Sequence, residues 1–240
     1  FGYSRNILLT PKDSTMGLPL SEQTLPDVLK EVNYKTKAIG KWHLGAHESL
    51  VPQKRGFDEF YGFVIGGHRY FPKDLTLNDL TEARSQMDGY ITKIFDNGKR
   101  VDISKYLTEE LSDNAVKFID ENSENPFFVY LSYNAPHTPL QATKKDLDRN
   151  MHIKGEKRRT YAAMVTSLDD GVGLILDKLV EKNISDNTIV VFFSDNGGVE
   201  WYNHSDNGIL RGGKGEFFEG GIRVPFVMQW PNVIPAGLTY

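Results

Sequence analysis

The 240-residue chain contains no cysteine. Disulfides, thiolate metal ligands and a thiol nucleophile are therefore excluded within these residues. The chain also lacks a run of 18 apolar residues, the minimum expected of a membrane-spanning helix. Neither sign of charge dominates, because 28 basic residues stand against 32 acidic residues and the net charge is −4. This near balance gives no general attraction to nucleic acid, so an anionic ligand needs locally placed positive charge.

Amphipathic helical segments alternate with apolar, strand-like segments along the chain. Helical spacing of apolar residues predicts helices over 24–33, 108–122 and 157–182. Apolar runs predict strands over 34–39, 127–133, 188–193 and 224–230. The alternation favours an α/β fold with a mostly parallel sheet sandwiched by helices. The continuous run at 188–193 is typical of a strand that is buried on both faces.

Two further segments have distinct patterns. Asn97-Gly98 marks the turn of a hairpin expected over 90–103. Residues 46–90 lack an apolar period and are expected to form long loops, which in compact domains are often functional. The aromatic residues of 57–71 are expected to form a pocket wall. His68 and Arg69 are candidates for a sugar subsite, with a structural role as the alternative.

Polar residues follow the ends of three predicted strands. Lys41 and His43 come after the first, and positions i and i+2 of an extended segment point the same way, so both side chains can reach one small anion. His137 follows the second of these strands, and Asp195 and Asn196 follow the third. Ligands of open α/β sheets bind beyond the carboxyl ends of strands. We therefore expect these residues to meet at one edge of the sheet.

The residue types indicate a site for a metal and an oxyanion. Asp195 and Asn196 offer hard oxygen ligands suited to Ca²⁺ or Mg²⁺, with an ordinary turn as the alternative. The histidines are candidates for proton transfer. Lys214, between two glycines that allow close backbone approach, adds a second cation to that of Lys41. The stretch 208–215 nearly matches a nucleotide phosphate loop, but glycine replaces the final hydroxyl residue, which excludes that function.

The ordered motifs resemble the sulfatase family of the alkaline-phosphatase-like superfamily. They are GKWHLG (40–45), RGFDEFYGF (55–63), NAPHTP (134–139), SLDDGVG (167–173), FFSDNGG (192–198) and LRGGKGEFFEGGIRVPF (210–226). The resemblance implies an alkaline-phosphatase-like fold and metal-assisted hydrolysis of a sulfate monoester. It further implies that His137 protonates the departing alcohol and that His43 holds the nucleophile and helps to release the sulfated intermediate. Lys41 and Lys214 would then bind sulfate oxygens.

Two elements of the family pattern are missing. One is an Asp pair near the first strand, which completes the metal site. The other is a Cys-x-Pro/Ala-Ser-Arg-type motif, whose Cys or Ser is oxidised to the formylglycine nucleophile; Ser4-Arg5 is not that motif. Both are expected upstream of Phe1, and the C-terminal subdomain is also expected to be absent. We therefore interpret residues 1–240 as a partial catalytic domain, truncated at both ends, that alone hydrolyses no sulfate ester.

Alternatives remain open at this level. A phosphatase or phosphodiesterase of the same superfamily would use two metals and further Asp and His ligands, whereas the Lys-Trp-His cluster favours sulfate and one metal. A non-catalytic relative that binds sulfated glycans is the other alternative. The long 46–90 segment suggests a carbohydrate sulfate as substrate. Family membership suggests export, and the lack of cysteine favours the bacterial periplasm or cell surface.

Overall fold

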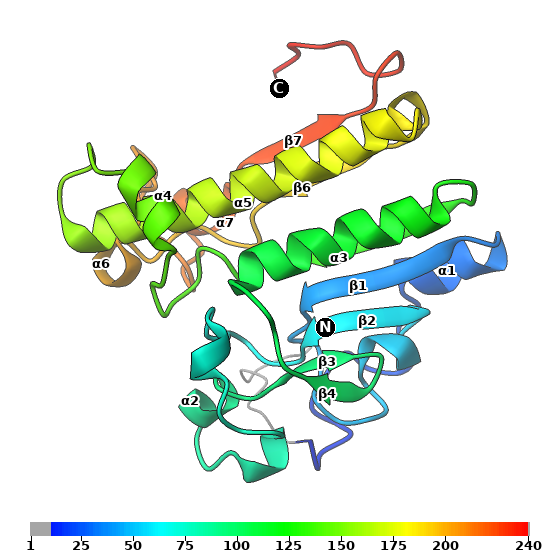
Figure 1. The fold of residues 1–240 in the computed structure, drawn as a ribbon, viewed down its shortest axis with the longest axis horizontal. Coiled ribbons are helices and arrows are strands. Elements are labelled where there is room, and N and C mark those ends of the chain that lie inside the picture. Colours follow the sequence, from blue (N-terminus) through cyan, green and yellow to red (C-terminus); the bar gives the residue numbers. More distant parts are fainter. Residues whose placement is uncertain (1–10, 240) are drawn as a thin grey trace.

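The computed structural model describes residues 11–239, in which a five-stranded sheet lies apart from a two-stranded sheet (Figure 1). The larger sheet has the order β4-β3-β2-β1-β5. Its strands are β1 (Lys35–Lys41), β2 (Glu59–Phe63), β3 (Ile94–Asp96), β4 (Lys99–Val101) and β5 (Phe127–Ser132). Strand β1 runs parallel to both β2 and β5, and the predicted hairpin adds β3 and β4 in antiparallel pairing. The carboxyl ends of the three parallel strands therefore meet at one edge.

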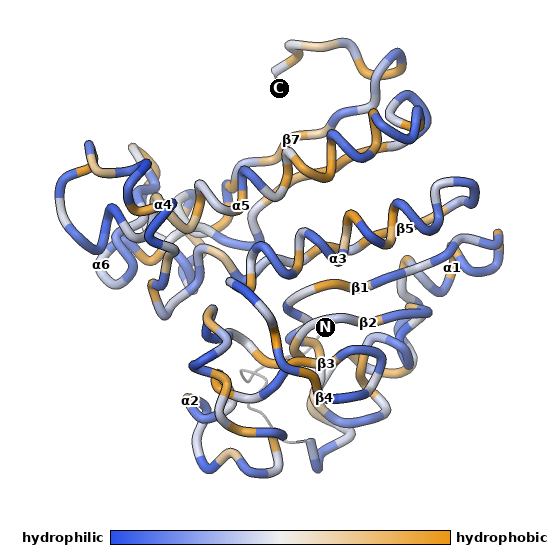
Figure 2. Tube along the Cα trace, in the orientation of Figure 1, coloured by the Kyte–Doolittle hydropathy of each residue, from blue (hydrophilic) through white to orange (hydrophobic). Residues whose placement is uncertain are grey.

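The long predicted helices are present as α3 (Leu107–Asn122) and α5 (Glu156–Glu181). Helix α3 lies against β1 and β5, and α5 runs alongside α3 (Figure 1). The apolar stripe of α3 is buried, with Leu111 and Ala115 fully covered and Phe118 2% exposed. Apolar residues recur as separate bands along both helices (Figure 2). A fully buried leucine or phenylalanine of this kind contributes about 1.5–3 kcal/mol to folding.

The two long helices approach closely at Gly171. A Cβ atom there would come within 2.2 Å of Ser112 Oγ and 2.7 Å of Tyr133 Oη. Those two hydroxyl groups hydrogen-bond to each other at 2.7 Å, joining α3 to the end of β5. Glycine at 171 therefore sets the spacing of α5 from the rest of the core.

Helix α1 (Leu25–Glu31) begins as predicted but packs differently from the prediction. Thr24 and Asp27 form a reciprocal capping box, which satisfies backbone N–H groups at the helix start. The predicted apolar face is largely open, because Leu25 is 58% exposed and Val32 is 59% exposed. The capping box, and not burial of that apolar face, therefore stabilises the start of this short helix.

The segment 46–90 differs most from the prediction. Its aromatic residues are core residues and do not form a pocket wall; Phe57, Phe60, Phe63 and Tyr70 are all at most 4% exposed. Residues 59–63 form β2, which the sequence analysis missed, and pair with β1. Short helices make up much of the remainder: η1 (Pro52–Lys54), η2 (Pro72–Asp74), η3 (Leu80–Glu82) and α2 (Gln86–Gly89).

The last two predicted strands form a separate antiparallel pair, β6 (Val190–Phe193) and β7 (Phe226–Gln229). The prediction that 188–193 is buried on both faces is wrong in this structure. Phe193 is 54% exposed and Val227 is 60% exposed, because no other layer of the described residues covers the pair. The remaining short helices are α4 (Lys144–Arg149), η4 (Ser185–Asn187), α6 (Glu200–Asn203) and α7 (Glu219–Ile222). Within residues 11–239, no helix combines the length and apolar character needed to cross a membrane.

Candidate active site

Lys41 is the last residue of β1 and places a cation at the carboxyl edge of the sheet. Its side chain is only 13% exposed, and Nζ lies 4.0 Å from Oδ2 of Asp195. Burial lowers the pKa of Lys41, since a desolvated ammonium is costly, and the positive charge of Lys214 lowers it further, while Asp195 opposes both. The β1 terminus therefore presents a partly desolvated cation.

His43 reaches the same place by a turn and not by an extended segment. The extended geometry expected for 41–43 is wrong, because His43 has a φ of 54° and Trp42 between them is buried. The Trp42 indole donates a hydrogen bond to the carbonyl oxygen of Leu50 at 2.8 Å, which anchors the turn. The imidazole lies against Gly66, where a Cβ would be 2.8 Å from Cε1. Burial, together with the charges of Lys41 and Lys214, lowers the pKa of His43 to about 4.

His137 lies in the loop after β5, and neighbouring backbone groups hold it. Its N–H donates to the carbonyl of Asn134 at 2.6 Å, and its own carbonyl accepts from the Tyr70 hydroxyl at 2.7 Å. Nδ1 lies 2.7 Å from the carbonyl oxygen of Thr138. Since a carbonyl accepts only, Nδ1 carries the proton, and Nε2 is the nitrogen available to a ligand. Burial lowers the pKa of His137, and the charges of Lys214 and Lys41 act in the same direction.

Asp195 and Asn196 lie in the turn that follows β6. The Asp195 side chain is 73% exposed, and the Asn196 amide nitrogen donates to the carbonyl of Gly197 at 2.8 Å. With its nitrogen bonded in this way, Asn196 keeps its amide oxygen as a candidate metal ligand. Both oxygens fit a hard cation such as Ca²⁺ or Mg²⁺. Residues 11–239 hold no group of three or more His, Cys, Asp and Glu side chains that could bind a metal, so this pair can supply only part of a coordination shell.

Lys214 is exposed and sits in a glycine-rich loop that is tied to the Asp195 turn. Its N–H donates to the carbonyl of Gly198 at 3.3 Å. Asn207, which the sequence analysis missed, links the two segments. Its amide oxygen accepts from the Gly198 N–H at 2.9 Å, and its amide nitrogen donates to the carbonyls of Gly198 and Gly212 at 3.1 and 3.0 Å. A mid-loop asparagine gives no periodic signal, so its role became visible only in the fold.

The structure brings five of the predicted site residues together: Lys41, His43, His137, Asp195 and Lys214. Burial is the main cause of the lowered pKa of His43, and Lys41, Lys214 and His137 lower it further while Asp195 raises it. The same two lysines and Asp195 act on His137. Charges influence one another to this extent only when they are near. The site therefore combines two lysines, two histidines held neutral at pH 7, and one exposed carboxylate.

The two candidates for a sugar subsite are placed differently. His68 is fully buried, with Nδ1 3.0 Å from the Arg69 carbonyl and Nε2 2.8 Å from the Thr92 carbonyl. The expectation that His68 contacts substrate is therefore wrong, since the imidazole fills the core beside Phe63, with ring centroids 4.8 Å apart. Arg69 is half-buried, and its N–H donates to the carbonyl of Tyr90 at 3.0 Å, which leaves it beside the cluster.

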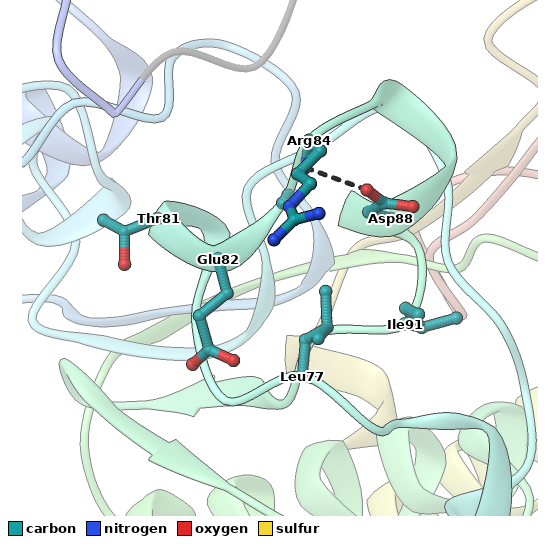
Figure 3. Close-up of a pocket in the computed structure, with 7 residues that line it drawn as sticks. Leu77, Thr81, Glu82, Arg84, Asp88 and Ile91 are labelled. Atoms are coloured by element: carbon teal, nitrogen blue, oxygen red, sulfur yellow. Dashed lines mark hydrogen bonds between the residues drawn. The ribbon is translucent and has the colours of Figure 1, made fainter.

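A surface hollow of about 650 Å³ lies elsewhere, in the 77–91 segment (Figure 3). Its wall includes Leu77, Glu82 and Ile91, and the Arg84 N–H donates to the Asp88 carboxylate at 2.8 Å. No residue of the lysine and histidine cluster lines this hollow. The candidate active site is therefore the charged edge of the sheet and not this hollow. Ser4 and Arg5, rejected above as the nucleophile motif, lie outside the described residues.

Comparison with known proteins finds similar sequences. A sulfatase family model matches residues 2–239. An arylsulfatase of Hemicentrotus pulcherrimus is 34% identical over 245 residues, covering 100% of this chain and 43% of that protein. Human N-acetylgalactosamine-6-sulfatase is 33% identical over 232 residues, covering 95% of this chain and 43% of that protein.

A solved structure is also similar. The structure of Ps i-CgsB in complex with k-i-k-neocarrahexaose superposes with a TM-score of 0.87 and 43% identity, covering 95% of this chain and 52% of that chain. The chain thus spans about half the length of these relatives. The mostly parallel sheet with flanking helices is the fold they share. The chain belongs to the sulfatase family.

Proposed function

We propose that residues 1–240 are the central part of a catalytic domain that hydrolyses a sulfate monoester with the help of a divalent metal. The observation that carries this proposal is the electrostatic cluster of two lysines and two neutral histidines at the carboxyl edge of the sheet. The relatives are about twice as long, which supports a site completed by segments outside this chain.

The two lysines would bind the sulfate oxygens. The Lys41 ammonium is largely removed from water, so its field on a bound anion is weakly screened. Lys214 approaches from an exposed, glycine-rich loop. Both charges stabilise the negative charge that grows on the leaving oxygen and the sulfate oxygens in the transition state.

His137 would protonate the leaving oxygen. Its Nδ1–H is engaged by the Thr138 carbonyl at 2.7 Å, so Nε2 is the nitrogen that exchanges a proton with substrate. In the free site, burial and the two lysines lower the pKa of His137. A bound sulfate ester brings negative charge that offsets the lysines and raises this pKa, so the acid forms when substrate is present.

His43 would orient the nucleophile. With a pKa of about 4, its imidazole is neutral at pH 7 and can accept a hydrogen bond from a nearby hydroxyl. A formylglycine residue, expected outside this chain, supplies a hydrated aldehyde as nucleophile when present. Asp195 and Asn196 would hold part of the shell of a Ca²⁺ or Mg²⁺ ion, which when bound would supply Lewis-acid stabilisation of the sulfate oxygens.

We further propose a sulfated carbohydrate as the substrate. A similar structure is described with a bound hexaose, and a curated relative is named for a sulfated amino sugar. Arg69, half-buried beside Tyr90, would contact the saccharide. Export to the bacterial periplasm or cell surface is proposed from family membership alone.

The test uses the full-length protein and three esters: 4-nitrophenyl sulfate, 4-nitrophenyl phosphate and a sulfated saccharide. We expect desulfation to exceed dephosphorylation, and residues 1–240 alone to release no sulfate. Lys41→Ala should lower kcat/KM by about 10²–10³. Lys144→Ala is the matched control, because its side chain is 86% exposed and pairs with Asp148 in its own helix.

The role of His137 is tested by comparing two substrates whose leaving groups differ in their need for a proton. Nitrophenolate leaves without a proton, whereas a sugar alkoxide needs one, so His137→Ala should slow saccharide desulfation far more than nitrophenyl sulfate hydrolysis. Equal losses on both esters would show that His137 is not the acid. Preference for the phosphate ester would overturn the assignment to sulfate.

A further inference from the structure

Two aromatic side chains stand open on α6, the short helix that follows the Asp195 turn. Trp201 is 85% exposed and Tyr202 is 57% exposed. Their ring centroids are 5.5 Å apart and their planes are inclined at 53°. Adjacent exposed rings of this size form an apolar patch of the kind that marks a binding surface.

The patch lies near the candidate active site, on the same side as Tyr90. Burial raises the pKa of Tyr90, and the nearby Tyr202 raises it further. The Tyr90 ring lies against Gly67, where a Cβ would meet it at 2.7 Å, and its centroid is 6.5 Å from that of His137. The exposed pair Trp201 and Tyr202 therefore lies near buried Tyr90, whose ring is close to that of the proposed acid.

Hydrogen bonds tie the backbone of helix α6 to its surroundings. The His204 N–H caps the helix on the Glu200 carbonyl at 3.1 Å. The Arg158 guanidinium donates to the His204 carbonyl at 2.7 Å, which ties the cap to α5. The Glu200 carboxylate accepts a hydrogen bond from the Asn207 N–H at 2.6 Å, so the one acidic side chain of α6 is bound to the loop that follows the helix.

We infer that Trp201 and Tyr202 form a platform for a pyranose ring of a sulfated oligosaccharide, one or more sugar units from the ester held by Lys41. A pyranose ring has an apolar C–H face and a hydroxyl rim, which match an aromatic face with an indole N–H or phenol O–H at its edge. Arg69, whose backbone N–H donates to the Tyr90 carbonyl, adds a basic residue near these rings. This inference rests on the proposed function and names the part of the site that selects a saccharide.

The test measures binding by calorimetry in the full-length protein, with the predicted nucleophile replaced by alanine so that the probe is not consumed. The probes are a sulfated carrahexaose, the same hexaose after chemical desulfation, and inorganic sulfate. The variants are Trp201→Ala and, as the matched control, Trp201→Phe, which keeps an aromatic face. Because Trp201 is 85% exposed, neither change removes core packing.

We expect Trp201→Ala to weaken binding of the sulfated hexaose roughly five- to ten-fold, consistent with the loss of one aromatic contact. Inorganic sulfate should bind unchanged, and Trp201→Phe should stay within about two-fold of the parent. Unchanged hexaose binding by Trp201→Ala would overturn the inference, as would an equal loss for inorganic sulfate. Trp201 fluorescence typical of a buried indole would overturn it too, since other parts of the protein would then cover the platform.

The desulfated hexaose separates this inference from the proposed function. If it binds as tightly as the sulfated hexaose and depends on Trp201, the platform stands and recognition of sulfate by the lysine cluster fails. If inorganic sulfate and the sulfated hexaose bind with no dependence on Trp201, the proposed function stands and the platform fails.

Discussion

Gly66 offers a direct test of how closely the site is built around His43. Its φ is not in the left-handed region, so alanine is compatible with the backbone. A Cβ would nevertheless lie 2.8 Å from Cε1 and 2.9 Å from Nε2 of the imidazole. To restore an ordinary 3.4 Å contact, the ring must retreat by about 0.6 Å. Gly66→Ala therefore displaces one side chain of the candidate active site without changing any charge.

The size of the effect follows from that displacement. A misplacement of 1 Å can cost about 10²-fold in rate, so 0.6 Å predicts roughly a ten-fold loss of kcat/KM, or about 1.4 kcal/mol of transition-state stabilisation. The assay is hydrolysis of 4-nitrophenyl sulfate by the full-length protein. Gly173→Ala is the matched control, because a Cβ there meets no atom within 4 Å and alanine favours the α5 helix.

The outcome distinguishes a positioning effect from a folding effect. Urea unfolding of both variants should show that Gly66→Ala remains folded while its kcat/KM falls. A Gly66→Ala enzyme with unchanged kcat/KM would refute the reasoning that His43 must occupy this position. Equal losses in Gly66→Ala and Gly173→Ala would refute the steric explanation.

Two further predictions concern the site loop and pH. Asn207→Ala should weaken binding of inorganic sulfate about ten-fold, because it removes three side-chain hydrogen bonds that join the Lys214 loop to the Asp195 turn. Asn203→Ala, which removes one hydrogen bond to Ser205, is the control. Equal effects of the two changes would contradict the proposal that Asn207 positions the Lys214 loop. The pKa values of His43 and His68 are about 4, below their ordinary 6.5, so the unfolded chain binds more protons between these values. Stability should therefore be full above pH 6.5 and decrease as pH falls toward 4, by roughly 3 kcal/mol for buried His68 and less for His43. Urea unfolding at pH 7 and 4.5 measures this loss of stability. The His68→Gln variant should show a smaller pH dependence of the free energy of unfolding, and the exposed His152→Gln variant should show the same dependence as the parent. Identical pH dependence in the parent and both variants would contradict the prediction.

Local sequence signals predicted the elements whose residues carry their own periodicity. The helices over 108–122 and 157–182 are present with nearly the predicted bounds, and the Asn97-Gly98 hairpin is present with shorter strands than expected over 90–103. Such elements depend on neighbouring residues, so a window of sequence contains the information. Strand β2 had no such signal, because it is defined by pairing with β1 some twenty residues earlier. The aromatic residues around it were therefore assigned to a pocket wall when they form the core.

The amino-acid sequence by itself determined the chemistry available: two lysines, two histidines and an Asp-Asn pair in sulfatase order, with no thiol. Tertiary structure decided which of those groups share a site. Long-range parallel pairing brings the ends of β1 and β5 to one edge, and a left-handed turn at His43 turns its ring toward Gly66. The fold also removed His68 from the site and revealed Asn207 and Trp201, because burial and loop contacts arise only between segments distant in sequence.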